Sequence, residues 1–169
     1  NVASLKKLKN VKLLILDSLY SEFRKKTPSE SVARLMLKEV LLKEENKGSS
    51  IIVTTFSSHL ARLNSITEFG KKLNRKIVFL GRSLGKYVGA AKDLNLINFA
   101  KNVEIVIWPK QIQKKLKEIE TNGRGKYLIA CTGNQGEPKS VLSKILNKKY
   151  NFNFHPNDLV IFSCNVIPT

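Results

Sequence analysis

The sequence predicts an α/β fold in which a mostly parallel sheet carries helices on both faces, within a single domain covering all 169 residues. Apolar runs rich in β-branched residues alternate along the chain with segments of helical periodicity, as in folds built on parallel sheets. These runs lack the polar alternation of half-exposed strands, which indicates burial on both faces. We therefore expect a Rossmann-like arrangement whose ligands gather at the carboxyl ends of the strands.

Six apolar runs are the predicted strands. They cover residues 11–18 (VKLLILDS), 50–56 (SIIVTTF), 75–81 (RKIVFLG), 103–108 (VEIVIW), 126–133 (KYLIACTG) and 158–167 (DLVIFSCNVI). Each run has the length and composition of a buried strand.

Helices are predicted between the runs. The first opens at Thr27-Pro28-Ser29-Glu30, with proline in its first turn. Its predicted inward stripe is Val32, Leu35, Met36 and Val40. Later helices are expected to bury Leu60, Leu63 and Ile66; then Ile112, Leu116 and Ile119 after Pro109; and finally Val141, Leu142, Ile145 and Leu146.

Charge is the main compositional signal. Lysine and arginine number 30 against 13 acids, which gives a formal charge of +17. Such an excess favours a polyanionic partner, above all nucleic acid, although a proteome biased toward lysine would give the same balance. The chain has no run of membrane-span length and no signal-peptide pattern, so we expect a cytoplasmic protein without a membrane partner.

Metal-ligand spacing is missing from the sequence. His59 and His155 stand far apart, and Cys131 and Cys164 fall within apolar runs. We therefore expect reduced cysteines, no metal ligands and no cofactor in this chain.

A glycine-rich turn, TGNQGEP at 132–138, separates a predicted strand from a predicted helix. Free backbone N–H groups and a helix start make such a turn an anion-binding candidate. The spacing of its glycines and lysine does not fit a P-loop or a dinucleotide fingerprint. Alternatively, Gly133 and Gly136 only permit a tight turn, while Gln135 and Glu137 cap the helix that starts near Pro138.

Five segments together resemble the β-CASP domain of ribonuclease J-type enzymes, and the tail favours the archaeal branch. In chain order they are LLILDSLYSEFRKKTPSE (13–30), TTFSSHLARL (54–63), GRSL (81–84), TGNQGEPKSVLSKI (132–145) and NDLVIFSCNVIPT (157–169).

The resemblance implies a ribonuclease whose catalytic part lies outside this chain. In that family the β-CASP domain is inserted into a metallo-β-lactamase domain, which binds two zinc ions and hydrolyses RNA, as a 5′-to-3′ exonuclease or an endonuclease. Residues 1–20 would be the strand leading in from that domain, with Asp17 beside the metal site. The isolated chain is then expected to be inactive. Otherwise Asp17 is an ordinary acid at a strand end.

The resemblance also implies partners and contacts. The partners would be single-stranded RNA, the metallo-β-lactamase domain of the same polypeptide and, in the full-length enzyme, a second copy in a homodimer. RNA contacts would come from Phe56, Ser58, His59, Arg62, Arg82 and Ser83. A 5′-phosphate pocket would comprise Thr132, Gly133, Asn134, Gln135 and Ser163, with asparagine standing at position 134 where the family has serine.

Plainer structural roles compete with these assignments. Phe56 could pack in the core, Arg62 could lie on a solvated helix face, and Ser58 could cap a helix beside a surface His59. Two other functions also remain open. One is a stand-alone Rossmann-like RNA-binding module without catalysis, and the other is an enzyme that binds a small phosphate compound in the glycine-rich turn.

Overall fold

A five-stranded, wholly parallel sheet forms the centre of the molecule, which confirms the predicted fold class. The computed structural model describes residues 2–18, 21–22, 24, 26–43, 48–165 and 167. The spatial order of the strands is β3-β2-β4-β1-β5. Their bounds are Ile51–Thr54 (β1), Lys76–Leu80 (β2), Val103–Val106 (β3), Tyr127–Cys131 (β4) and Leu159–Phe162 (β5).

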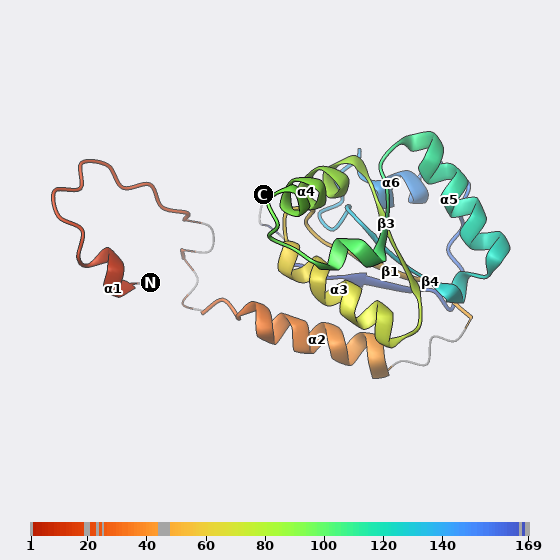
Figure 1. Cartoon of the computed structure of the whole chain (residues 1–169), viewed down its shortest axis with the longest axis horizontal. Coiled ribbons are helices and arrows are strands. Elements are labelled where there is room, and N and C mark those ends of the chain that lie inside the picture. The colour runs from red at the N-terminus through yellow and green to blue at the C-terminus, as the bar shows by residue number, and fades with distance from the viewer. Residues whose placement is uncertain are drawn as a thin grey trace.

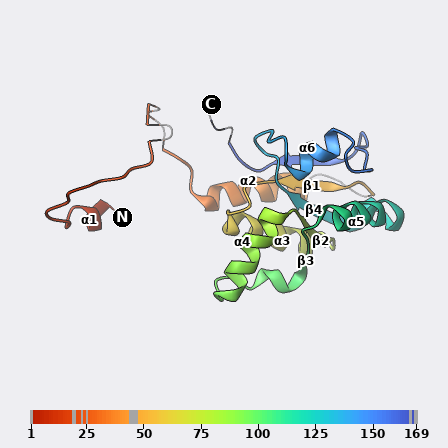
Figure 2. The same ribbon diagram turned by 90° about the horizontal axis from the view of Figure 1, so that it is seen from above.

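Helices cover both faces of the sheet (Figures 1 and 2). One face carries α2 (Glu30–Lys43), α3 (Leu60–Lys72), α4 (Arg82–Asp93) and the short helix η1 (Phe99–Asn102). The other carries α5 (Pro109–Asn122) and α6 (Val141–Leu146). The short helix η2 (Arg124–Lys126) leads into β4, and α1 (Val2–Leu5) lies away from the sheet near the amino terminus (Figure 1). No helix in the described ranges is long and apolar enough to cross a membrane.

The core consists of one apolar cluster on each face of the sheet. Central strand β4 contributes to both, with Ile129 and Cys131 on the α5–α6 side and Leu128 and Ala130 on the α2–α4 side. Complete burial raises the pKa of the Cys131 thiol to about 12, so this side chain behaves as a small hydrophobe. The predicted inward positions of α3 and α5, among them Ile66 and Leu116, are buried as expected, except Leu60, which is half-buried at the start of α3.

The predicted first strand, residues 11–18, is wrong. This segment has no strand assignment, and its apolar side chains are exposed, with Ile15 at 84% and Leu13 at 77%. Figures 1 and 2 show it running away from the sheet. Apolar character favours burial but does not supply a neighbour, and within the described part of the chain no strand pairs with this segment.

The predicted inward stripe of α2 is also wrong. Its members Val32, Leu35, Met36 and Val40 are all exposed, between 41% and 62%. The helix instead buries Leu37 and Leu41 where it packs against α3. Because α2 is apolar around much of its circumference, periodicity alone offers two faces, and contact with α3 selects one. Leu146, predicted to be buried on α6, is likewise exposed at the end of that helix.

Helix α4 has no counterpart among the predicted helices. It contains Gly85 and Gly89, whose low helix propensity obscures the apolar stripe of Leu84, Val88 and Ala91. Gly85 allows close packing, because a Cβ placed there would lie 2.3 Å from Cγ2 of Ile107. The missing side chain therefore lets α4 approach the segment that follows β3.

Two buried arginines bind groups at the amino ends of the strands. Arg124 pairs with Asp158, whose side chain is 1% exposed and also accepts hydrogen bonds of 2.9 Å from the backbone N–H groups of Ser50 and His155. Arg75 donates to the carbonyl oxygens of Ser49 and Tyr127 at 2.7 and 3.0 Å. These hydrogen bonds compensate most of the buried charge, although Nε of Arg124 has no partner among the described residues, and they fix the edge opposite to the predicted ligand edge.

Candidate functional site

The carboxyl ends of all five strands form one aligned row. The register pairs Val106 with Leu80, Leu80 with Cys131, Cys131 with Thr54, and Thr54 with Phe162. Since parallel strands end at the same edge, the residues that follow this row lie side by side there. Nearly all the predicted site residues are in these following segments.

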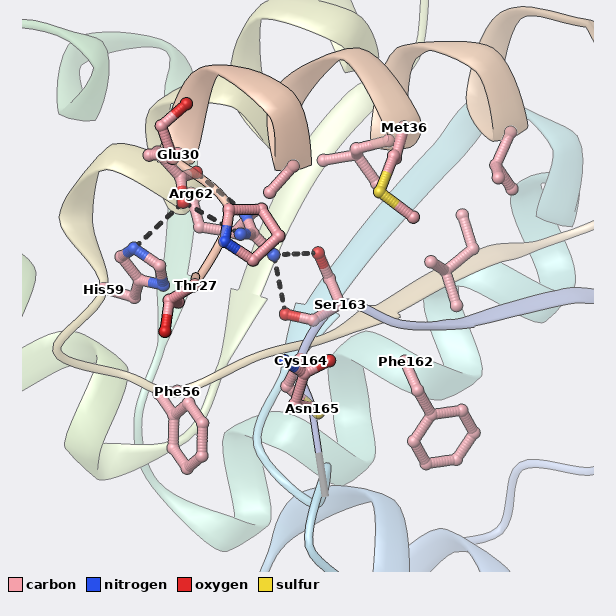
Figure 3. A pocket seen from close by; sticks show the side chains of 16 residues that line it. Thr27, Glu30, Met36, Phe56, His59, Arg62, Phe162, Ser163, Cys164 and Asn165 are labelled. Atoms are coloured by element: carbon pink, nitrogen blue, oxygen red, sulfur yellow. Dashed lines mark hydrogen bonds and ion pairs between the residues drawn. The ribbon is translucent and has the colours of Figure 1, made fainter. Parts of the chain in front are cut away.

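A groove of about 440 Å³ opens at one end of this edge, between α2, the β1–α3 loop and the end of β5. Figure 3 shows its lining, which includes Glu30, Met36, Phe56, His59, Arg62 and Ser163. Four residues predicted to contact RNA or phosphate therefore share one cavity although they come from three separate elements. Both apolar and charged groups line it, as is usual for ligand-binding clefts.

Arg62 organises the groove. Its Nε and Nη2 atoms donate to the two carboxylate oxygens of Glu30, each at 2.8 Å. Its Nη1 atom donates to the carbonyl oxygen and the Oγ of Ser163, at 2.8 and 2.6 Å. Arg62 thus joins α3 to the start of α2 and to the segment after β5. This bidentate geometry is the strongest that arginine makes with a carboxylate.

His59 extends this network toward solvent. Its Nε2 lies 3.2 Å from Oε2 of Glu30, and its side chain is 42% exposed. The hydrogen bonds from Arg62 are the largest cause that lowers the pKa of Glu30, and the charges of Arg62 and His59 add to this effect. Glu30 is therefore a carboxylate at neutral pH. Phe56, half-buried, also lines the groove (Figure 3).

Three of the plainer structural roles do not match the geometry. Arg62 is only 7% exposed, so it is not on a solvated helix face. Ser58 does not cap α3, because the N-cap residue is His59 and no side chain makes the capping hydrogen bond. Phe56 does not pack in the core, because it belongs to neither of the two buried clusters.

The glycine-rich turn is fastened to the segment after β5. Gln135 donates from Nε2 to the carbonyl oxygen of Asn165 at 2.8 Å, and its Oε1 accepts from the N–H of Ile167 at 2.9 Å. The alternative in which Gln135 and Glu137 cap a helix near Pro138 is wrong, because α6 begins later and is capped by Ser140. The side chain of Gln135 therefore ties the turn to the segment after β5.

Asn134 occupies an unusual position in that turn. Its side chain is 5% exposed, and neither Oδ1 nor Nδ2 has a hydrogen-bond partner among the described residues. Gly133, beside it, has φ +129°, and a Cβ there would lie 2.5 Å from Cβ of Leu142. A buried amide without partners is rare and calls for a water molecule or a ligand.

The remaining predicted site residues lie outside the groove. Arg82 and Ser83 begin α4 and are exposed at the same edge of the sheet, beyond β2. Thr132 and Gly133 follow β4, between Arg82 and the groove in strand order. Asp17 belongs to the exposed amino-terminal segment.

Comparison with known proteins agrees with this arrangement. The model of the family described as "Ribonuclease J, beta-CASP domain" matches residues 48–169. This chain belongs to the ribonuclease J β-CASP family. The resemblance carried by the five segments is thereby confirmed.

Several members named "Ribonuclease J" are similar over most of this β-CASP chain. The protein from Pyrococcus abyssi is 41% identical over 94% of the chain, and that from Methanocaldococcus jannaschii is 44% identical over 85%. A bacterial relative from Helicobacter pylori is 34% identical over 95%. The matched regions cover 34%, 32% and 22% of those three relatives, so this chain spans about a third of the archaeal proteins and less of the bacterial one.

The resemblance to ribonuclease J implies zinc, which the described residues do not fit. Nowhere in the described ranges do three or more His, Cys, Asp or Glu side chains gather as a metal site would require. His59, the histidine in the groove, is engaged with Glu30 instead. No chemical step through zinc is therefore derived for the β-CASP residues.

Sequence reasoning misses three site residues. The sequence predicts only a helix start at Glu30 and no role in the site, although the Thr-Pro-Ser-Glu segment belongs to the motifs that resemble the family. Phe162 and Asn165 line the groove but read as strand residues. The signal for Glu30 is present in its motif, whereas the other two become visible only when β5 is placed at the sheet edge beside α2.

Proposed function

We propose that this chain holds single-stranded RNA and its 5′ end for a ribonuclease that hydrolyses phosphodiester bonds elsewhere. The hydrolysis belongs, in this proposal, to a zinc-dependent metallo-β-lactamase domain of the same polypeptide. Membership of the ribonuclease J β-CASP family is the observation that carries the proposal. The expectation that the isolated chain neither binds zinc nor cleaves RNA stays a prediction.

The charge at the carboxyl edge supports a polyanionic ligand. Arg82 and Lys86 in α4, Lys110 in α5 and Lys139 before α6 form no ion pair with any described residue. Many of the acids are paired elsewhere, as Asp158 is at the amino edge. Unpaired cations along one edge are the pattern that contacts a phosphate backbone.

An aromatic ring and the polar side chains around it support single-stranded RNA as the ligand of the groove. Phe56 offers a partly exposed ring on which a base can stack. Arg62 is already bonded to Glu30 and Ser163, so its part in this proposal is to position both of them. His59, which is 42% exposed beside Glu30, and the exposed Ser58 are the polar side chains of the same loop that would face the strand.

End recognition is assigned to the turn that follows β4. The unsatisfied amide of Asn134 could donate to a terminal phosphate, in place of the family's hydroxyl. Thr132 is half-buried beside it, and the turn is bonded to the segment that follows Ser163. The Oγ of Ser163 accepts from Arg62, which leaves its hydroxyl proton to donate.

Equilibrium binding of two oligoribonucleotides of identical sequence, one 5′-monophosphorylated and one 5′-hydroxyl, tests the proposal on this chain. We expect tighter binding of the monophosphorylated strand. Ser163→Ala should reduce that preference by roughly ten- to a hundredfold, since a hydrogen bond to a charged group contributes about 1.5–3 kcal/mol.

Thr121→Ala is the matched control, because it deletes an exposed hydroxyl near the end of α5 that bonds only within its own helix. It should leave the preference unchanged. Equal binding of both oligonucleotides would remove end recognition from the proposal. Absence of RNA binding at low salt would overturn the proposal altogether.

A further inference from the structure

Trp108 is the one tryptophan of the chain, and its side chain is exposed. It is 54% exposed, between the end of β3 and the start of α5. Its ring makes no aromatic or cation–π contact with the described residues. Large aromatic side chains are usually buried when their only role is packing. The exposure of Trp108 therefore makes it a candidate for contact with a ligand.

The strand register places Trp108 in line with the proposed RNA groove. Val106, Leu80 and Thr54 belong to the aligned row of strand ends. Two positions beyond that row stand Trp108 after β3, Arg82 after β2 and Phe56 after β1. Neighbouring strands lie about 4.8 Å apart, so three strand spacings separate the Trp108 and Phe56 backbones by about 14 Å. A short stretch of single-stranded nucleic acid covers that distance.

Positive charge surrounds the tryptophan. The first turn of α4 lies against Ile107, the residue before Trp108, because a Cβ on Gly85 would be 2.3 Å from Cγ2 of Ile107. That turn begins with the exposed Arg82, the exposed Lys86 follows it directly, and Lys110 follows Trp108 by two residues. None of these three cations forms an ion pair with a described residue. A flat ring among unpaired cations is the composition of surfaces that bind single strands.

We propose that Trp108 is a second base-stacking position for the RNA strand, and this rests on the proposed function. The strand would run from the groove across the carboxyl edge of the sheet, with phosphates near Arg82 and a base stacked on the indole. A protein partner would also cover an exposed aromatic residue. The neighbouring cations and the alignment with Phe56 favour nucleic acid.

Intrinsic fluorescence tests this proposal directly, because all tryptophan emission from this chain comes from Trp108. The probes are an oligouridylate of about twelve nucleotides and an abasic ribose-phosphate strand of equal length, titrated at low salt. We expect the oligouridylate to quench or shift the emission at saturation. The abasic strand should do so much less, because stacking needs a base.

Trp108→Ala should raise the Kd for oligouridylate by about five- to 150-fold, the range that one stacked base contributes. Trp108→Phe should lose less, because it keeps a ring. Neither change removes a helix cap, since Trp108 makes no side-chain cap hydrogen bond. Leu96→Ala is the control, because it deletes an exposed apolar side chain beyond the far end of α4.

Each outcome decides between the two proposals. If the chain binds RNA with unchanged emission, and Trp108→Ala binds as tightly as the parent, only the stacking role of Trp108 is overturned. Equal effects of the abasic strand and the oligouridylate would also overturn it. Loss of self-association in Trp108→Ala, without any loss of RNA binding, would assign the residue to a protein interface. If the chain does not bind RNA, the proposed function fails and this inference fails with it.

Discussion

Arg62 shows how one charged side chain can organise a site. Its guanidinium is bonded on one side to Glu30 and on the other to Ser163, so three chain segments depend on one group. Removing either partner of a buried pair costs more than the pair contributes, because the remaining charge loses its compensation. The groove should therefore depend on Glu30 for its shape.

Glu30→Gln tests that dependence. Because the pKa of Glu30 is lowered in the folded chain, its ionisation contributes stability above its ordinary value near 4.5. This contribution is lost as the pH falls through the lowered value. We expect the substitution to reduce the free energy of unfolding by about 1–3 kcal/mol at pH 7. Urea denaturation of parent and variant between neutral and acidic pH measures the difference, which should shrink toward acid.

Glu39→Gln is the matched control on the same helix. Glu39 pairs with Lys43 at 3.2 Å, but both side chains are more than 60% exposed. An exposed pair of this kind contributes about 0–1 kcal/mol, so the control should change little at any pH. Equal effects of the two substitutions would mean that Arg62 does not depend on Glu30.

Helix α4 is the element whose position depends most on a missing side chain. Gly85 lets the helix pack closely against Ile107, and this contact brings Arg82 to the edge beside Trp108. At Gly89, one turn later, a Cβ would have no other atom within 4 Å. The two glycines of one helix therefore have different reasons to be there.

Alanine at each glycine should shift stability in opposite directions. Gly85→Ala should destabilise the fold by about 1–2 kcal/mol, because overpacking costs roughly 1–3 and better helix propensity offsets up to about 1. Gly89→Ala should stabilise it by about 0.5–1 kcal/mol through propensity alone. Thermal or urea unfolding measures both. Stabilisation by Gly85→Ala would show that the Ile107 side chain can move to make room for the added methyl group at little cost.

Charge is distributed unequally over the whole molecule. The amino edge of the sheet holds arginines bonded to carboxylates and carbonyls, as Arg124 is to Asp158. The carboxyl edge holds cations without a described acidic partner, Arg82 among them. Part of the net charge of +17 therefore lies unpaired along the proposed RNA path.

Salt dependence of RNA binding measures that asymmetry. The slope of log Kd against log salt should correspond to several phosphates at about 0.7 per contact. Arg82→Ala should reduce the slope by about one such contact. Lys126→Ala removes an equal charge at the amino edge, where β4 begins, and should leave the slope unchanged. Equal effects of both substitutions would mean that only the total charge matters.

The sequence predicts five of the strands, the parallel sheet and the segments that carry the site, because these depend on local composition. Buried parallel strands are continuous apolar runs, and ligand residues follow them directly, so 50–56 and 126–133 are readable without a structure. The family resemblance rests on the same short segments. Burial of Ile66 and Leu116 follows from periodicity alone.

Only the tertiary structure decided which apolar faces are covered and which charged groups are paired. Residues 11–18 have the composition of a strand, yet strand formation needs a neighbour that local composition cannot supply. Helix α2 offers two apolar stripes, and contact with α3 chose Leu37 over Met36. The sequence around Arg62 shows no acidic partner for its guanidinium. In the fold, Glu30 and Ser163, which are distant in sequence, accept its hydrogen bonds. Pairing and burial depend on groups brought together by folding, so no local pattern contains them.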